Sequence, residues 1–104
     1  MNPPVIDLKS EHQQLILTIL RKHLPSTSKV WVFGSRAKGS ARKYSDIDLV
    51  VDMSGEPLSI EILADLATDF EESDLPFKVD IVDWNTINKE FKQLIADQRI
   101  ALDF

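Results

Sequence analysis

Two aspartates, Asp46 and Asp48, stand two positions apart in an otherwise apolar run and are the strongest candidates for chemistry in this sequence. On an extended strand both side chains would leave the same face, with their α-carbons about 6.6 Å apart. Because Mg²⁺ takes carboxylate oxygens together with waters and substrate phosphates, the pair could bind one Mg²⁺ or lie between two. A solvent-facing polar stripe on a half-exposed strand gives the same pattern, and it is the commoner case for an isolated Asp-x-Asp.

A glycine–serine pair lies upstream of the two aspartates. Gly34 and Ser35 directly follow the apolar run Val30–Phe33. A residue without a side chain would let a phosphate approach the backbone, where amides and the serine hydroxyl could donate hydrogen bonds. A simple strand-to-helix turn would explain these two residues without any ligand. It would not explain the basic residues that lead from the turn to the aspartates, which are Arg36, Lys38, Arg42 and Lys43.

Helices on either side of these motifs are predicted by apolar residues at helical spacing. The first is expected at about Ser10–His23, where Ser10 and Gln13 form a capping-box pattern. A short helical turn followed by a loop is expected within residues 36–45, and a second long helix over residues 58–70. These helices would frame the strands that carry the motifs.

Strands are predicted where β-branched and aromatic residues cluster. Three such runs occur, at Val30–Phe33, at residues 47–51 and at Phe77–Val82, the last with Asp80 among apolar neighbours. The resulting order is αβαβαβα, which predicts an α/β (α+β) fold. A chain of 104 residues suits one domain with one core, so we expect residues 1–104 to form a single domain.

The C-terminal part of the chain is expected to add one more helix to this core. Asn85 or Thr86 could cap it, and its apolar face would be made by Ile87, Phe91, Leu94 and Ile95. The tail Ile100–Phe104 is apolar enough to dock, either as an edge strand or against a partner.

Composition excludes several classes of function. The 12 basic and 17 acidic residues give a net charge of −5, which argues against a protein that binds nucleic acid along a whole face. The absence of cysteine excludes disulfides, thiolate catalysis and cysteine-bound metals, and it fits a reducing compartment. No apolar segment approaches the ~20 residues of a membrane helix. We therefore expect a soluble, cytoplasmic protein.

The motif residues together resemble those of the minimal nucleotidyltransferases in the polymerase-β-like superfamily. The hallmark of that family is Gly-Ser, ten residues, and then Asp-x-Asp. Here Gly34-Ser35 is followed by the ten residues Arg36–Ser45 and then by Asp46-Ile47-Asp48. The resemblance covers nearly the whole chain and implies the family's fold, a short mixed β-sheet packed with helices.

The resemblance also implies a third carboxylate on a later strand. Asp80 is similar in position, and Asp83 is its competitor. On a strand, Asp80 projects opposite to Val79 and Ile81, so it can face the site while they face the core. Asp83 would fall at the strand end on the other face. Asp80 could instead be an edge-strand acid that deters aggregation.

The reaction implied by the resemblance is attack of a hydroxyl on the α-phosphorus of ATP, with pyrophosphate leaving. Asp46 and Asp48 would bind two Mg²⁺ ions, and Asp80 would help to hold the ion that activates the hydroxyl. Gly34 and Ser35 would cradle the β- and γ-phosphates. The basic residues Arg36, Lys38, Arg42 and Lys43 are weaker candidates for nucleotide binding, because each could be a solvated loop charge.

Chains of this kind resemble the antitoxin halves of toxin–antitoxin modules whose toxin is an α-helical HEPN ribonuclease. The resemblance implies that AMP is transferred from ATP to a tyrosine hydroxyl of the HEPN toxin, which would neutralise it. Two alternatives stay open. The chain could neutralise its partner by binding alone, with a vestigial nucleotide site, or it could modify a small molecule or an RNA end. The acidic chain makes RNA the less attractive acceptor.

Overall fold

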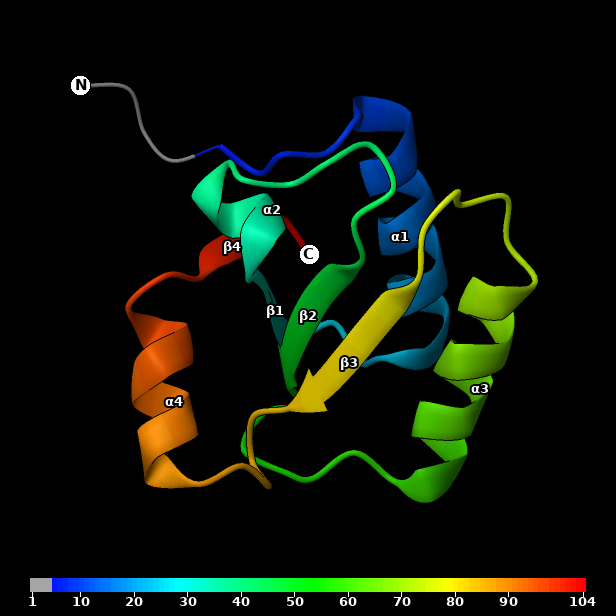
Figure 1. Ribbon diagram of the computed structural model, residues 1–104. Helices are drawn as coiled ribbons and strands as arrows, with labels where there is room; N and C mark the ends of the chain where they lie inside the picture. Colours follow the sequence, from blue (N-terminus) through cyan, green and yellow to red (C-terminus); the bar gives the residue numbers. More distant parts are fainter. Residues whose placement is uncertain (1–4) are drawn as a thin grey trace.

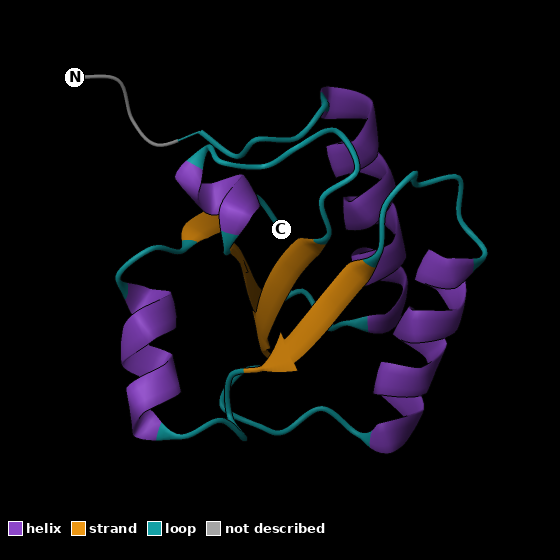
Figure 2. Ribbon diagram, in the orientation of Figure 1, coloured by secondary structure: helices purple, strands orange, loops and turns teal. Residues whose placement is uncertain are grey.

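The computed structural model describes residues 5–104, which form four helices and four strands around one sheet (Figures 1 and 2). The elements in chain order are α1 (Ser10–His23), β1 (Lys29–Phe33), α2 (Ser35–Lys38), β2 (Ile47–Asp52), α3 (Ile60–Glu71), β3 (Val79–Asp83), α4 (Lys89–Ala96) and β4 (Ile100–Leu102). This is the small α+β arrangement with a mixed sheet that the motif resemblance implied, so the predicted fold class is confirmed.

The sheet has the strand order β3-β2-β1-β4. β1 runs antiparallel to both β2 and β4, whereas β2 and β3 are parallel and are joined by a crossover through α3. The expectation that the apolar tail could pair as an edge strand is confirmed by β4. The register places Asp48 opposite Phe33 on one side and opposite Asp80 on the other.

Alternation along the strands divides the sheet into two faces. In β2, the residues Ile47, Leu49 and Val51 point into the main core, where α1 and α3 supply residues such as Leu20 and Leu66. Asp48, Val50 and Asp52 point to the other face. Val50 and Ile95 of α4 are both fully buried there. Figure 1 shows α1 and α3 together on one side of the sheet and α4 on the other.

Two predicted helix caps were wrong, although the first helix spans Ser10–His23 as expected. The capping box at Ser10 and Gln13 does not form: Lys9 is the N-cap, Ser10 is already helical, and the Gln13 N–H donates to the Lys9 carbonyl at 3.0 Å. The last helix is capped by Asn88 rather than by Asn85 or Thr86.

Asn85 and Thr86 cannot cap that helix because they close the end of β3. The Asn85 amide donates to Asp52 Oδ1 at 2.8 Å, and the Thr86 N–H donates to the Asp83 carbonyl at 3.1 Å. The first free side chain that can accept from the helix is Asn88 Oδ1, which accepts from the Phe91 N–H at 2.8 Å. Ile87 therefore precedes the helix instead of lying on its apolar face.

Within residues 5–104 no helix combines the length and the apolar character that crossing a membrane requires. The longest helix, α1, spans Ser10–His23 and ends in three basic residues.

Candidate functional site

The turn after β1 brings the backbone of Gly34 into direct contact with the side chain of Asp48. Gly34 has φ 73° and ψ −153°, a conformation that is open to glycine and strained for any other residue. A Cβ atom added at Gly34 would overlap Asp48 Oδ2. Glycine at this position therefore serves two needs, the backbone angle and the room for a carboxylate.

Three carboxylates share the region beside this turn. The parallel register sets Asp48 and Asp80 at neighbouring positions on the same face of the sheet, and Asp46 immediately precedes β2. The pKa of Asp48 is raised, first by burial and then by the negative charges of Asp80 and Asp46. The structure thus brings together the three acidic residues predicted from the sequence.

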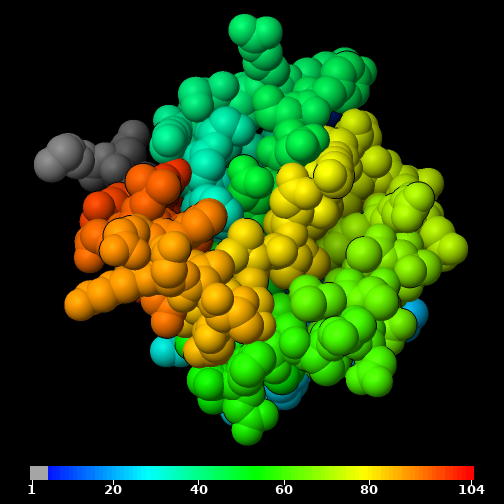
Figure 3. Space-filling model, turned by 60° about the horizontal axis from the view of Figure 1, so that its bottom comes forward, coloured from blue at the N-terminus to red at the C-terminus, as the bar shows by residue number. Residues whose placement is uncertain are grey.

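Asp80 and Asp46 are the more open members of this trio. Asp46 is exposed, and the Asp80 side chain is 40% exposed and lies 3.4 Å from Lys78 Nζ. Figure 3 shows β3 as a yellow band between α4 in orange and α3 in yellow-green, with the loop that precedes β2 at one end of the band. A large substrate could approach the acids from this side.

The donor set suits a hard divalent cation. Among residues 5–104, no three His, Asp or Glu side chains are placed so that they could hold a metal ion by themselves. Mg²⁺, however, is commonly bound through one or two carboxylates together with waters and substrate phosphates. Asp48 has a carboxylate oxygen against the bare Gly34 backbone and negative neighbours in Asp46 and Asp80. The residues present therefore fit Mg²⁺ that arrives with a triphosphate.

The Gly34–Ser35 turn opens the short helix α2. The Gly34 carbonyl accepts from the Ala37 and Lys38 N–H groups at 3.0 and 3.1 Å. Ser35 is half-buried at the first position of α2, where its hydroxyl could donate to a ligand. The Gly34 N–H donates to Gln98 Oε1 at 3.0 Å. Gln98 was missed by the sequence analysis, because no local motif marks a partner that lies 64 residues further along the chain.

Arg36 is placed to shape the motif loop. Its buried guanidinium donates to the Ser45 carbonyl through Nε at 3.1 Å and Nη2 at 2.8 Å, and to the Asp7 carbonyl through Nη1 at 2.8 Å. It also lies 4.3 Å from the centroid of the Phe77 ring. Because its donors are used by backbone carbonyls, Arg36 holds the loop next to Asp46 and is not presented to a phosphate. Lys38, in contrast, is exposed at the end of α2.

The other basic residues of the loop lie around a separate cavity of about 320 Å³. Arg42, Lys43 and Tyr44 line it together with residues of the N-terminal segment and Phe77. None of the three acids is among its described lining residues. The structure therefore does not gather Arg42 and Lys43 with the acids in one cavity.

Asp83, the competitor of Asp80, has a structural use. Its carboxylate is buried and accepts from the Leu58 N–H at 2.8 Å and from the Asn85 N–H at 3.1 Å. It lies on the core face of β3, opposite to Asp80. These bonds tie the end of β3 to the segment before α3, and they leave Asp80 as the acid of β3 that faces Asp48.

Comparison with known proteins agrees with this geometry. Residues 14–102 match the family described as polymerase beta, nucleotidyltransferase. A relative from Haemophilus influenzae, named probable protein adenylyltransferase MntA, is 46% identical over 97 residues, which are 93% of this chain and 83% of the relative.

Solved structures are similar to the chain as well. A crystal structure of a toxin–antitoxin with AMP-PNP matches with a TM-score of 0.72 and 28% identity over 86% of this chain and 71% of that one. A chain from a tri-AMPylated Shewanella oneidensis HEPN toxin in complex with MNT antitoxin matches with a TM-score of 0.69 over 91% and 71% of the two chains, and at 24% identity this likeness shows the fold. The chain belongs to the polymerase-β nucleotidyltransferase family.

Proposed function

We propose that this chain is a Mg²⁺-dependent protein adenylyltransferase that transfers AMP from ATP to a tyrosine hydroxyl of a HEPN-family toxin and thereby acts as an antitoxin. The observation that carries the proposal is Asp48, whose pKa is raised by burial and by Asp80 and Asp46 while its carboxylate lies against Gly34. A carboxylate in this position gains most from a bound cation. The relative named as a protein adenylyltransferase supports the same reaction.

Each part of the site has a role in holding the nucleotide. The hydroxyl of Ser35 would donate to the β- and γ-phosphates, and the missing side chain at Gly34 would let them approach the turn. Asp46 and Asp48 would hold two Mg²⁺ ions, and Asp80 would share the ion nearer to the acceptor. Bound Mg²⁺ would neutralise charge on the triphosphate and lower the pKa of the acceptor hydroxyl.

The transfer itself forms one bond and breaks another. The hydroxyl oxygen bonds to the α-phosphorus, the bond from that phosphorus to the oxygen bridging to the β-phosphorus breaks, and pyrophosphate leaves. Asp80 is the proposed acceptor of the hydroxyl proton, because it lies on the outer strand β3 and is open to an incoming chain. Lys38, exposed at the end of α2, is a further candidate for contact with the phosphates.

The proposed partner follows from the similar structures. One contains a toxin–antitoxin with AMP-PNP, and another contains a HEPN toxin that is tri-AMPylated and bound to its MNT antitoxin. An acidic chain is poorly suited to RNA, which favours a protein acceptor. Dependence on ATP and the lack of cysteine support a cytoplasmic location.

Intact mass spectrometry tests the proposal directly. The chain is incubated with a candidate HEPN-family toxin, Mg²⁺ and ATP, and we expect the toxin to gain the mass of one or more AMP units, on tyrosine. The Asp46→Ala/Asp48→Ala variant should give no gain. The control Asp65→Ala/Asp74→Ala, which removes two exposed acids on and after α3, should act like the wild type. An unmodified partner with the wild type would contradict the proposal.

The same variant separates catalysis from occlusion. If AMP transfer neutralises the toxin, co-expression of Asp46→Ala/Asp48→Ala at equal abundance leaves cells inhibited. Full rescue by that variant would show that binding alone is sufficient and that AMP transfer is not required to neutralise the toxin.

A further inference from the structure

Gln98 connects the C-terminal segment to the turn at the centre of the site. It lies between α4 and β4, and its Oε1 accepts from the Gly34 N–H at 3.0 Å. This contact is partly buried and joins residues 64 apart in sequence. Among the described side chains, Gln98 is the one that accepts from the Gly34 N–H. Gly34 is also the residue whose backbone lies against the Asp48 carboxylate.

The side chain of Gln98 is oriented by a second bond. Its Nε2 donates to the Leu94 carbonyl at 3.3 Å, while its backbone N–H donates to the Ile95 carbonyl at 3.1 Å. With the amide nitrogen directed at the end of α4, the amide oxygen is left to face Gly34. The helix end therefore sets the direction of the acceptor.

Arg99 fixes the same segment from the other side. Its guanidinium carbon lies 4.1 Å from the ring centroid of Trp31 and 4.7 Å from that of Trp84, and its N–H donates to the Ile95 carbonyl at 2.8 Å. The two ring centroids are themselves 6.1 Å apart, so the guanidinium lies over both indoles and is attracted by both rings. Because Trp31 belongs to β1 and Trp84 follows β3, this contact ties the segment that carries Gln98 to the sheet that carries the acids.

We infer that Gln98 is a positioning residue for nucleotidyl transfer, which holds the Gly34 turn in its positive-φ conformation so that the Asp48 carboxylate and the Ser35 hydroxyl face the same triphosphate. This inference rests on the proposed function. Glycine has many backbone conformations open to it, and an acceptor for the Gly34 N–H favours the one that accommodates Asp48, in addition to the bonds that the Gly34 carbonyl accepts from α2. Because the Gly34 N–H is used by Gln98, contacts from this turn to phosphate fall on Ser35.

Substitutions at Gln98 and at a matched glutamine test the inference. Gln98→Met removes the strong acceptor but keeps the length of the side chain, whereas Gln98→Glu keeps an acceptor for the Gly34 N–H and loses only the weaker bond of 3.3 Å to the Leu94 carbonyl. Gln93→Met is the control, because Gln93 is exposed on α4 and bonds only to Asp97. Should Gln98→Met fail to fold, Gln98→Asn retains polarity and withdraws the carbonyl by one carbon.

Amide hydrogen exchange at Gly34, followed by NMR on the chain alone, is the first readout. We expect exchange to accelerate about tenfold in Gln98→Met, in line with the loss of one hydrogen bond, and to stay slow in Gln98→Glu and Gln93→Met. The second readout is AMP transfer to the partner. We expect kcat to fall about 10- to 100-fold in Gln98→Met, as when a supporting contact of a metal site is lost, with a smaller change in KM for ATP and recovery in Gln98→Glu.

The outcomes separate this inference from the proposed function. Unchanged Gly34 exchange in Gln98→Met overturns the inference whatever the activity. Faster exchange with unchanged kcat overturns it as well, because the contact would then be structural only. If the wild type transfers no AMP, the proposed function fails, and calorimetry with Mg²⁺ and AMP-PNP decides on Gln98: equal affinities of wild type and Gln98→Met overturn its role.

Discussion

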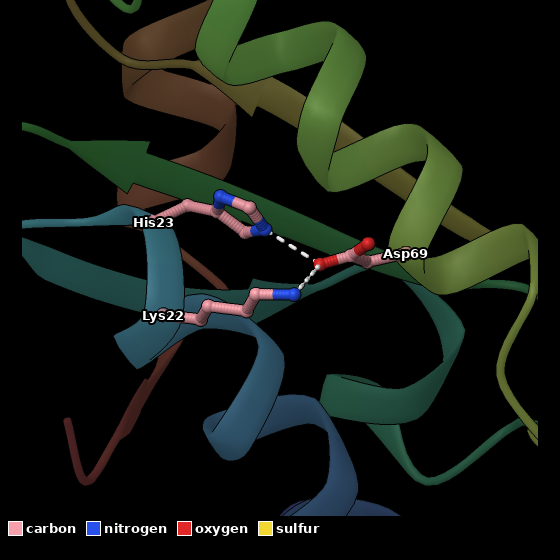
Figure 4. A network of polar contacts seen from close by, with 3 residues as sticks. All are labelled: Lys22, His23 and Asp69. Atoms are coloured by element: carbon pink, nitrogen blue, oxygen red, sulfur yellow. Dashed lines mark hydrogen bonds and ion pairs between the residues drawn. The ribbon is translucent and has the colours of Figure 1, made fainter.

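Asp48 and Asp69 lie on different sides of the sheet and ionise in opposite surroundings. Asp69 on α3 meets His23 Nε2 at 2.6 Å and Lys22 Nζ at 3.4 Å, both from α1 (Figure 4). His23, above all, lowers the pKa of Asp69. Asp48 is half-buried and lies near two other acids, and both the burial and the negative charges raise its pKa. The fold supplies cationic partners to Asp69, where a carboxylate joins two helices, whereas the neighbours that shift the pKa of Asp48 are themselves acids.

Asp52 is a closer comparison for Asp48 than Asp69 is, because Asp52 and Asp48 lie on the same strand and the same face of the sheet. The Asn85 amide and the Gly55 N–H donate to its carboxylate, and these bonds lower the pKa of Asp52. Position on β2 therefore does not decide how an aspartate ionises. What decides is whether neighbouring segments supply hydrogen-bond donors to the carboxylate, as Gly55 and Asn85 do for Asp52.

The largest effect is expected from removing the unpartnered charge. Asp48→Asn should reduce AMP transfer by more than the about 100-fold that follows loss of a supporting contact in a metal site, because the residue itself is a proposed ligand. Radiolabelled ATP and the partner measure this. Asp52→Asn, on the same face of β2, is the control and should stay active. Equal losses in the two variants would mean that stability, and not the ligand, explains the effect.

The second largest effect is expected from filling the space between Gly34 and Asp48. In Gly34→Ala the added Cβ overlaps Asp48 Oδ2 and the backbone stays at positive φ. We expect both a loss of AMP transfer and a destabilisation of about 2 kcal/mol or more, measured by denaturant unfolding. Gly55→Ala also has a positive φ but meets nothing within 4 Å, so it should cost only the backbone strain and should keep its activity. Identical behaviour of the two variants would remove the specific role of Gly34.

Alanine substitutions should show that the two acids of β3, Asp83 and Asp80, have different roles. Asp83→Ala leaves the Leu58 and Asn85 N–H groups without their buried acceptor, which we expect to lower the free energy of unfolding by about 1–3 kcal/mol. The folded fraction should still transfer AMP. Asp80→Ala should do the reverse, with little change in stability and a loss of transfer. Loss of transfer in Asp83→Ala under conditions where it is folded would contradict this division.

The pH dependence of stability should also distinguish Asp48. Its raised pKa means that the folded chain binds the Asp48 proton more tightly than the unfolded chain, so ionised Asp48 destabilises the metal-free protein. Asp48→Asn should therefore unfold at a higher temperature than the wild type at neutral pH. This advantage should shrink as the pH falls through the raised pKa towards the ordinary value of 3.8. Thermal unfolding of both proteins across this pH range measures the difference in stability. A lower unfolding temperature for Asp48→Asn than for the wild type at pH 7 would contradict the prediction.

The smallest effect is expected at the paired aspartate. Because the folded pKa of Asp69 is lowered, its contribution to stability is present above the ordinary value of 3.8 and is lost as the pH falls through the folded pKa. Asp69→Asn should be slightly less stable than the wild type at neutral pH, since an ion pair that stays partly open to water contributes little. Thermal unfolding with Asp65→Asn as the exposed control checks this. A gain in stability in Asp69→Asn would contradict the prediction that Asp69 and Asp48 affect stability with opposite signs.

Local patterns in the sequence predicted much of this arrangement. Helical spacing located α1 at Ser10–His23, and the apolar runs located the three longer strands. The Gly34-Ser35 and Asp46-x-Asp48 motifs predicted residues that the structure places near one another, because each motif depends on residues that are close in sequence. The cap of α4 was misplaced because Asn85 and Asn88 have equal capping chemistry, and only the distant Asp52 decides that Asn85 is used elsewhere.

Contacts between distant segments explain what the sequence did not reveal. Asp80 was expected near Asp48 only from the family resemblance, because its place there depends on the register of two parallel strands joined by α3. The commitment of the Arg36 guanidinium depends on the backbone of Asp7 and Ser45, so a residue that resembles a phosphate ligand on paper is bound to carbonyls in the fold. Gln98 carries no signature at all, since its role follows only from where the end of α4 meets the turn after β1.

The central claim is that Asp46, Asp48 and Asp80 receive a divalent cation together with a nucleotide, and paramagnetic NMR tests it most directly. Mn²⁺ in place of Mg²⁺ is added below stoichiometry to the ¹⁵N-labelled chain with AMP-PNP. We predict that amide signals of residues 34–35, 46–48 and 80 broaden first, that those of Lys22, His23 and Asp69 stay sharp, and that Asp48→Asn removes the effect. Broadening that is centred elsewhere, or that is the same in Asp48→Asn, would contradict the claim.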